Sequence, residues 1–283
     1  LDEKAGTNSE INYLLVLLLR EAGFDCNPAL ARSNNRGLIQ KAYPLLSQFD
    51  QVLAFVELYG KRIFLNATSP YRPFDLIAEK DLNYYAFVLK KGNPFWAKIE
   101  PNEKNHQDVL ITYDYSNSEN PVCKLRVREN GYFAAESRKE LTEVGSESWM
   151  TNLFDLEKCD FQKDSLHFTN EENVNLSLKM ECDLKLENSL DQESDYIYVN
   201  LFNKKDLKNP FLKESRQYRV DYNYPRSRSY MVKIILPEGY QFEDFPKRKK
   251  IILSGETGKY TLNSQIIGKE LCIRTSFSIN ATS

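Results

Sequence analysis

The chain has 283 residues, 41% of them hydrophobic and 28% charged, which is ordinary for a globular protein of two or three domains with a sizeable core. Its formal net charge of −2 argues against a nucleic-acid surface, so the basic run Lys247-Arg248-Lys249-Lys250 is interpreted as a solvated stretch beside a strand. No signal peptide opens the chain and no apolar stretch approaches ~18 residues, so no membrane span is predicted.

The cysteines give no sign of a disulfide framework or a zinc site. They are odd in number, far apart and without C-x-x-C spacing, and we expect them to pack as small apolar side chains. No other motif indicates a cofactor or a metal, so neither is predicted. The five are Cys26, Cys123, Cys159, Cys182 and Cys272.

The first predicted element is a helix that begins after Thr7 and ends before Gly23. Thr7 and Glu10 fit a capping box, and Gly23 fits the left-handed residue that follows a helix. The apolar residues recur at helical spacing, and two more widen the apolar face, so a helix buried on most sides is expected. They are Ile11, Leu14, Leu15, Val16, Leu17, Leu18, Leu19 and Ala22.

An antiparallel sheet is predicted after this helix. Residues 25–32 have the pattern of a strand, and 33–37 that of a turn. Residues 52–59 and 62–68 are predicted to form a hairpin around a two-residue turn at Gly60-Lys61.

Three segments of this region, taken together, resemble the transglutaminase-like cysteine peptidase superfamily. Residues 6–23 resemble its nucleophile helix, residues 48–57 its histidine strand, and Leu65-Asn66-Ala67-Thr68 its Leu-Asp-x-Thr segment. The resemblance puts Asn8 in the nucleophile position, Gln51 in the base position and Asn66 in the aspartate position. It implies a helix-plus-sheet core whose three reacting groups have all been replaced.

The replacements have direct chemical consequences. An asparagine is not a nucleophile that a base can activate, and a glutamine has no titrating nitrogen. Asn66 is the mildest change, because an amide can still orient an imidazole. The fallback nucleophiles are Ser9 and Cys26, although capping is the expected role of Ser9 and burial that of Cys26.

The rest of the chain reads as β-rich. Its two histidines, His106 and His167, lie there, and we expect His106 to be a loop residue. Residues 131–144 and 147–157 are predicted helices separated at Gly145-Ser146. Strict alternation between Val174 and Leu186 predicts a long strand with one face on a core. Further strands are expected at 85–89, 95–99, 109–115, 123–127, 196–202, 231–236, 250–253, 258–262, 264–267 and 270–277.

With Tyr224-Pro225 before a predicted strand and a Pro237-Glu238-Gly239-Tyr240 turn after it, the C-terminal half resembles the β-rich domains of unknown function that accompany transglutaminase-like cores in bacterial envelope proteins. That architecture implies a further sandwich upstream of Leu1 and a periplasmic or cell-envelope location. The predicted domains are a core at 1–82, a β-rich domain with a helical insert at 83–192, and a β-rich C-terminal domain at 193–283. Whether the last two form one unit is left open.

We therefore expect an α+β, mostly β chain: a partial transglutaminase-like core followed by sandwich-like β domains. The leading functional hypothesis is a catalytically inactive relative that acts as a binding or structural module of the bacterial cell envelope, with a peptide, protein or glycan at the degenerate cleft. One alternative is an active peptidase or amide-transfer enzyme with a displaced nucleophile, which requires a Cys or Ser near His106 or His167. Another is a carbohydrate-binding β module.

Overall fold

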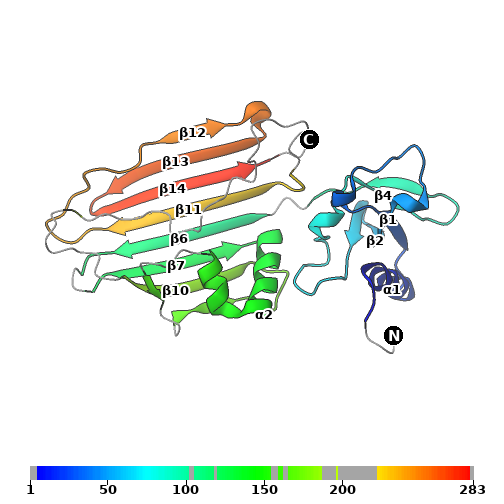
Figure 1. The fold of residues 1–283 in the computed structure, drawn as a ribbon, viewed down its shortest axis with the longest axis horizontal. Helices are drawn as coiled ribbons and strands as arrows, with labels where there is room; N and C mark the ends of the chain where they lie inside the picture. Colours follow the sequence, from blue (N-terminus) through cyan, green and yellow to red (C-terminus); the bar gives the residue numbers. More distant parts are fainter. Residues whose placement is uncertain are drawn as a thin grey trace. The chain divides into compact units, whose positions relative to one another are not determined.

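The computed structural model describes residues 5–101, 105–117, 120–153, 159–161, 165–186, 196 and 222–280. The chain is α+β and mostly β, as predicted, and it divides into two compact units (Figure 1). Unit 1 consists of residues 1–103 with 223–225, and unit 2 of residues 104–222 with 226–283. Among the described residues, no helix has the length and apolar content needed to cross a membrane.

Helix α1 (Asn8–Glu21) begins and ends where the sequence predicts. The backbone N–H of Thr7 donates to Glu10 Oε2 at 2.7 Å, and the Glu10 N–H donates back to Thr7 Oγ1 at 3.4 Å, which completes the capping box. After the helix, Gly23 takes a φ of 90° and the N–H of Phe24 bonds to the carbonyl of Leu19. That pairing is the Schellman arrangement, which needs a residue without a Cβ penalty at Gly23.

The expected burial of α1 on most sides is wrong. Only Asn12 and Val16 are buried, whereas Tyr13, Leu17 and Leu18 are about half exposed at 50%, 46% and 59%. The helix packs on a single sheet face, and this covers only one stripe of its surface. The remaining apolar side chains have no second layer among the described residues.

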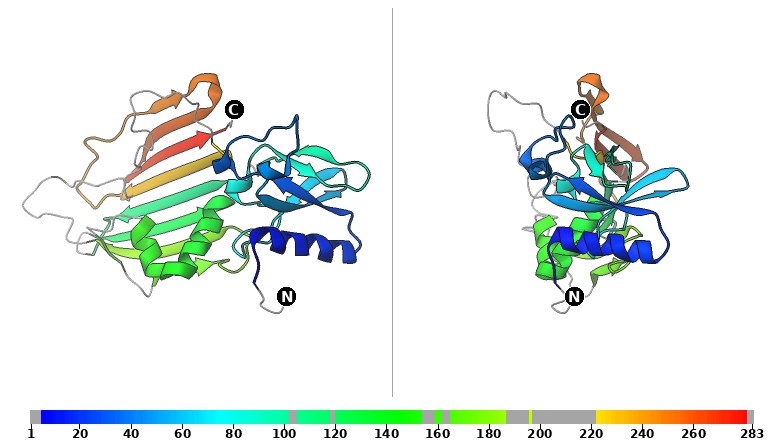
Figure 2. Two further views of the ribbon diagram at one scale, coloured as in Figure 1. Left: turned by 45° about the vertical axis from the view of Figure 1, so that its right-hand side comes forward. Right: turned by 90° about the vertical axis from the view of Figure 1, so that its right-hand side faces the viewer.

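The sheet of unit 1 has the strand order β3-β2-β1-β4-β5, and all of its pairs are antiparallel. Figure 2 shows α1 running along one face of this sheet. The β2–β3 turn is one residue earlier than predicted, at Tyr59-Gly60, where both φ angles are positive (50° and 75°). The strands are β1 (Cys26–Ala31), β2 (Gln51–Leu58), β3 (Lys61–Leu65), β4 (Tyr85–Val88) and β5 (Phe95–Lys98).

The first sheet extends past residue 82, where the sequence predicted the end of the first domain. Strand β4 pairs with β1, Leu30 opposite Phe87, so residues 85–98 belong to the first sheet. The ring of Phe87 stacks on Phe49 and packs at a tilt against Trp96 of β5. Short 3₁₀ turns connect the strands at η1 (Asn34–Arg36), η2 (Leu46–Gln48) and η3 (Glu79–Asp81), and η5 (Ser254–Glu256) lies in unit 2.

Unit 2 is built on one nine-stranded sheet with the order β12-β13-β14-β11-β6-β7-β10-β8, and β9 pairs with β10 beside this path. Sandwich-like layers were expected, but strands from both predicted β-rich regions lie in this single sheet. They join where β11 pairs with β6 in parallel. The strands are β6 (His106–Asp114), β7 (Val122–Glu129), β8 (Cys159–Phe161), β9 (His167–Thr169), β10 (Leu178–Leu186), β11 (Arg226–Ile235), β12 (Lys249–Ile252), β13 (Gly258–Ile267) and β14 (Glu270–Ile279).

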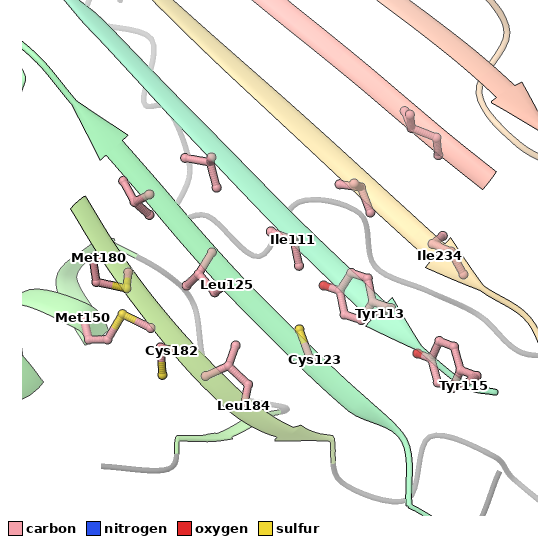
Figure 3. Packing of buried hydrophobic residues seen from close by; sticks show 14 of the residues in the cluster. Ile111, Tyr113, Tyr115, Cys123, Leu125, Met150, Met180, Cys182, Leu184 and Ile234 are labelled. Atoms are coloured by element: carbon pink, nitrogen blue, oxygen red, sulfur yellow. The ribbon is translucent and has the colours of Figure 1, made fainter. Parts of the chain in front are cut away.

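The core of unit 2 lies between the sheet and helix α2 (Tyr132–Leu153), which is broken at Gly145 as predicted. Gly145 has a φ of 81°, so the chain turns there and brings Trp149 and Met150 onto the sheet. Figure 3 shows Met150 beside Met180 and Cys182 of β10, with Leu125 of β7 next to them. These side chains come from alternate strand positions, and the intervening residues of β7 are exposed.

Some predicted elements differ in extent. The alternating strand begins at Leu178, since residues 174–177 form turns and bends, and the strands predicted at 258–262 and 264–267 are one continuous strand, β13. His106 begins β6 and is not in a loop. The strand predicted at 196–202 and the end of the second helix, 154–157, lie outside the described residues.

One buried cation holds a loop against α2. Arg138 is 3% exposed, and its guanidinium donates to the carbonyl oxygens of Asn170, Glu171, Asn173 and Leu176 at 2.8–3.3 Å. A guanidinium suits this role because its donors are fixed in one plane and it carries no acceptor. Arg138 therefore binds four carbonyl groups of the loop before β10, which Asn170 and Ser177 also hold through bonds at 2.9 and 2.6 Å.

Replacing Arg138 with methionine removes every donor while keeping much of the apolar stem. Because the four carbonyls then lose a charged partner inside the fold, we expect a loss of about 3 kcal/mol in the free energy of unfolding. Denaturant unfolding of the whole chain measures it. Lys139→Met on the exposed side of the same helix is the control and should cost less than ~0.5 kcal/mol. Equal effects of the two variants would contradict this account of Arg138.

Candidate functional site

The start of α1 carries two of the predicted site residues. Asn8 and Ser9 are the first two residues of the helix and are half-buried. Thr7, and neither of them, accepts the capping hydrogen bond. Among the described residues, the side chains of Asn8 and Ser9 make no hydrogen bond, so Ser9 has no base beside it. Among the described residues, Ser9 therefore lacks the general base that a serine nucleophile needs.

One turn further along α1, Asn12 connects the helix to the sheet. Its amide nitrogen donates to the carbonyl of Val52 at 2.8 Å, and its oxygen accepts the backbone N–H of Ala67 at 2.8 Å. The side chain is 1% exposed. Sequence reasoning missed this residue, although an asparagine four residues before the buried Val16 was a signal that this polar side chain faces the core.

Asn66 is a buried structural residue in this arrangement. Its oxygen accepts from Asn12 Nδ2 at 3.3 Å and from Thr68, through the backbone N–H at 3.0 Å and the hydroxyl at 2.6 Å. Its amide nitrogen donates to Asp81 Oδ2 at 3.0 Å. The carboxamide is thus engaged at both ends, and no imidazole takes part.

Asp81 is the charged end of this network and has a second oxygen that makes no hydrogen bond among the described residues. Its side chain is 0% exposed. Burial raises the pKa of Asp81 to about 6, although the charges of Lys80 and Arg72 and the hydrogen bond from Asn66 work in the opposite direction. The carboxyl group therefore changes protonation in a mildly acidic range.

Gln51 lies apart from this network. Ala54 and Val56 of β2 pack with Val16 of α1, so alternation along the strand puts Gln51 on the other face of the sheet. Its amide donates to Ser33 Oγ at 3.4 Å. Among the described residues, no hydrogen bond joins the three predicted positions Asn8, Gln51 and Asn66 to one another.

Ser33 is held by the aspartate that precedes Gln51. Asp50 accepts the backbone N–H of Ser33 at 2.7 Å and its hydroxyl at 2.7 Å. Burial works to raise the pKa of Asp50, but these hydrogen bonds and the charge of Arg36 outweigh it, and the pKa is lowered. Ser33 therefore donates to a carboxylate whose lowered pKa makes it a poor base for activating a serine.

Cys26, the second fallback nucleophile, is sealed in the core of unit 1. It is 1% exposed and packs with Val16, Ala54 and Val56. Burial raises the pKa of the thiol. Since the thiolate is the reactive form, this environment disfavours nucleophilic chemistry. Unit 1, residues 1–103 with 223–225, contains no histidine.

The loop between β1 and β2 exposes large apolar side chains on a fixed backbone. The Gln48 side chain is buried and bonds to both backbone groups of Gln40 and to the carbonyl of Tyr43. We name residues 38–46 the apolar loop. Its exposed side chains are Leu38 (59%), Tyr43 (74%), Leu45 (65%) and Leu46 (77%). Fixed, exposed apolar side chains of this kind are typical of interaction surfaces.

The two histidines lie in unit 2. His167 begins β9 and is exposed. His106 is the first residue of the central strand β6, and its ring nitrogens meet Ser227 Oγ at 2.7 Å and Asp108 Oδ1 at 2.8 Å. The sequence-based alternative of an active enzyme requires a Cys or Ser near His106, but it did not identify Ser227, because that residue is 121 positions away along the chain. Among the described residues, no three His, Cys, Asp or Glu side chains form a group suited to a metal ion.

Comparison with known proteins gives two matches. A family model described as a domain of unknown function with a solved structure, DUF3858, matches residues 193–283. The crystal structure of a "putative protease" from Parabacteroides distasonis is similar over 98% of this chain, with 11% sequence identity and a TM-score of 0.46. The chain spans 38% of the length of that protein. No curated protein matches.

The raised pKa of Asp81 predicts a pH dependence of stability. An acid whose pKa is higher in the fold than in the unfolded chain stabilises the fold below the ordinary pKa of 3.8 and loses that contribution as pH rises through about 6. Asp81→Asn keeps an acceptor for Asn66 and removes the charge. Its stability relative to the natural protein should therefore increase by roughly 2.4 kcal/mol between pH 4 and 7.

Urea unfolding at a series of pH values measures this difference. The control is Asp75→Asn, because Asp75 is an exposed carboxyl in the same unit. Its stability difference from the natural protein should stay level with pH. A level difference for Asp81→Asn as well would show that Asp81 is not the buried acid described above.

Proposed function

We propose that unit 1 is a catalytically inactive, transglutaminase-like binding module. The observation that carries the proposal is the position of Asn66, whose carboxamide is consumed in bonds to Asn12, Thr68 and Asp81. In the resemblance, this position belongs to an aspartate that orients a histidine. Bonded in this way, the Asn66 carboxamide stabilises the fold and does not orient a catalytic histidine.

The other two positions support the same conclusion. Asn8 is not a nucleophile, and the amide of Gln51 bonds to a serine that is itself bonded to Asp50. Cys26 is buried in the core. A helix packed on an antiparallel sheet accords with the core that the resemblance implies. Unit 1 therefore has such a scaffold but, among its described residues, lacks the nucleophile and base needed for acyl transfer.

The apolar loop is the part of unit 1 best suited to binding. Its leucines offer no hydrogen bonds to the hydroxyl groups of a sugar, whereas apolar side chains of a peptide or protein can cover them. Gln48 fixes the backbone beforehand, which reduces the entropy lost when a partner binds. We therefore propose a peptide or protein partner in preference to a glycan.

The catalytic half of the proposal is tested with fluorogenic peptides and with amine-donor substrates for amide transfer. We expect no turnover above the buffer rate. In the folded protein, iodoacetamide should modify Cys26 at least ~100-fold more slowly than in urea, because a buried, protonated thiol is unreactive. Turnover that disappears in Ser9→Ala or Cys26→Ala would contradict the proposal.

The binding half is tested by probing peptide and glycan arrays with the whole chain. Leu46→Asp puts a charge on the apolar loop, and we expect it to lower peptide binding at least tenfold without unfolding the protein. The matched control is Leu17→Asp on the exposed side of α1, which should leave peptide binding unchanged. Glycan binding that Leu46→Asp does not alter would favour the alternative of a carbohydrate-binding β module.

A location in the bacterial cell envelope is the remaining part of the proposal. It rests on the resemblance of the C-terminal half to domains found beside transglutaminase-like cores in envelope proteins. Fractionation of the source cells tests it, and recovery of the protein with cytoplasmic markers would contradict it.

A further inference from the structure

A serine, a histidine and an aspartate meet where two central strands of the nine-stranded sheet, β6 and β11, begin. Strands β6 and β11 lie side by side and run in the same direction (Figure 1), with Ser227 opposite His106 in the parallel register. Asp108 is two residues after His106 on β6. The pleat therefore puts His106 and Asp108 on the same face, while Gln107 and Val109 are buried on the core face.

The imidazole of His106 bridges the other two side chains. Its Nδ1 is 2.7 Å from Ser227 Oγ, and its Nε2 is 2.8 Å from Asp108 Oδ1. In the neutral tautomer with the proton on Nε2, the ring donates to Asp108 and accepts the hydroxyl proton of Ser227. A nucleophile, a base and an orienting carboxylate are thus connected in order, with the ring nitrogens exchanged relative to the chymotrypsin arrangement.

The backbone holds this geometry rigidly. The N–H of Ser227 donates to the carbonyl of Asn105 at 3.0 Å, and the carbonyl of His106 accepts from the N–H of Asn130 at 2.9 Å. Strand β6 is paired on both sides, with β7 and with β11. The three side chains are therefore preorganised on central strands, where reacting groups are held most accurately.

The cluster is also accessible. The side chains of His106 and Asp108 are 37% and 44% exposed, and Ser227 is partly exposed. Ser278 of β14 lies directly opposite Ser227 on the other side of β11. It shares the same sheet face and has no histidine opposite it, so it is a matched internal control.

We propose that Ser227 is an activated nucleophile that takes up acyl groups from small esters, with His106 as its general base and Asp108 as the residue that orients the imidazole. The Oγ atom forms a bond to the acyl carbon, and the bond from that carbon to the leaving oxygen breaks. The hydroxyl proton passes through His106 to the leaving oxygen, so the products are acyl-Ser227 and an alcohol. This site is in unit 2 and does not depend on the proposed role of unit 1.

The probe is an alkyl fluorophosphonate, which reacts with activated serines. The serine oxygen bonds to phosphorus, fluoride leaves, and His106 takes up the hydroxyl proton. The whole chain is incubated with the probe, and adducts are counted by intact mass and located by peptide mapping. We expect one adduct, on Ser227, forming at least ~100-fold faster than on Ser278, in line with the usual contribution of a general base.

Variants distinguish a Ser227 hydroxyl that is activated by His106 from one that is merely exposed. Ser227→Ala should abolish the adduct, and Ser278→Ala should leave its rate unchanged. His106→Gln keeps a hydrogen-bonding side chain without a base and should slow labelling about 100-fold. Asp108→Asn should slow it less, because the imidazole remains. Circular dichroism establishes that each variant is folded.

The natural protein alone suffices to overturn the proposal. If Ser227 gains no adduct, or gains one no faster than Ser278, the serine is not activated, whatever the variants do. Labelling that is equally fast in a folded His106→Gln variant would also overturn it. An adduct on Ser9 in place of Ser227 would overturn it and contradict the inactive role proposed for unit 1, whereas an adduct on Ser227 leaves that role untouched.

Discussion

One buried carboxamide fixes how the helix of unit 1 lies on its sheet. Asn12 donates to the carbonyl of Val52 and accepts the N–H of Ala67. It therefore binds one backbone group near the start of β2 and another beyond the end of β3. Apolar contacts alone tolerate rotation or sliding of a helix by part of a turn. Two directional bonds from one side chain do not, since either movement would leave a buried amide unsatisfied at a cost of about 1–3 kcal/mol.

The same bonds account for the character of the candidate site. Where the resemblance calls for a reacting thiol, imidazole and carboxylate, the chain has amides, and the buried amides are used to build the fold. The one buried charge nearby, Asp81, lies at the end of this network and is kept largely neutral at low pH by burial. The buried polar groups of this network are therefore bonded to one another, apart from a single oxygen of Asp81.

The sequence predicted features that depend on neighbouring residues. The capping box at Thr7 and Glu10, the left-handed Gly23 and the break at Gly145 follow from local geometry, and each is present. The sequence could not reveal what covers an apolar surface. The exposed Leu17 and Leu18 of α1 have the pattern of buried residues, because periodicity records which residues are apolar and not how many layers surround them.

The sequence also could not predict how strands that are far apart along the chain pair with one another. Nothing near Phe87 indicates that β4 lies beside β1, and nothing near Ser227 indicates that it faces His106. In both cases the register is set by the whole sheet. The cluster of Ser227, His106 and Asp108 therefore had no signal in the sequence beyond the spacing of His106 and Asp108, which places two polar side chains on one strand face.

The parallel contact between β6 and β11 also has a consequence for how unit 2 is assembled. Strands β13 and β14 can form a local hairpin, and so can β6 and β7, because each pair is close along the chain. The seam between the two halves joins segments about 120 residues apart, and closing so long a loop is entropically slow. Until the seam forms, the ten-residue strand β11 lacks a partner along one edge, and an unpaired strand edge can pair with another chain.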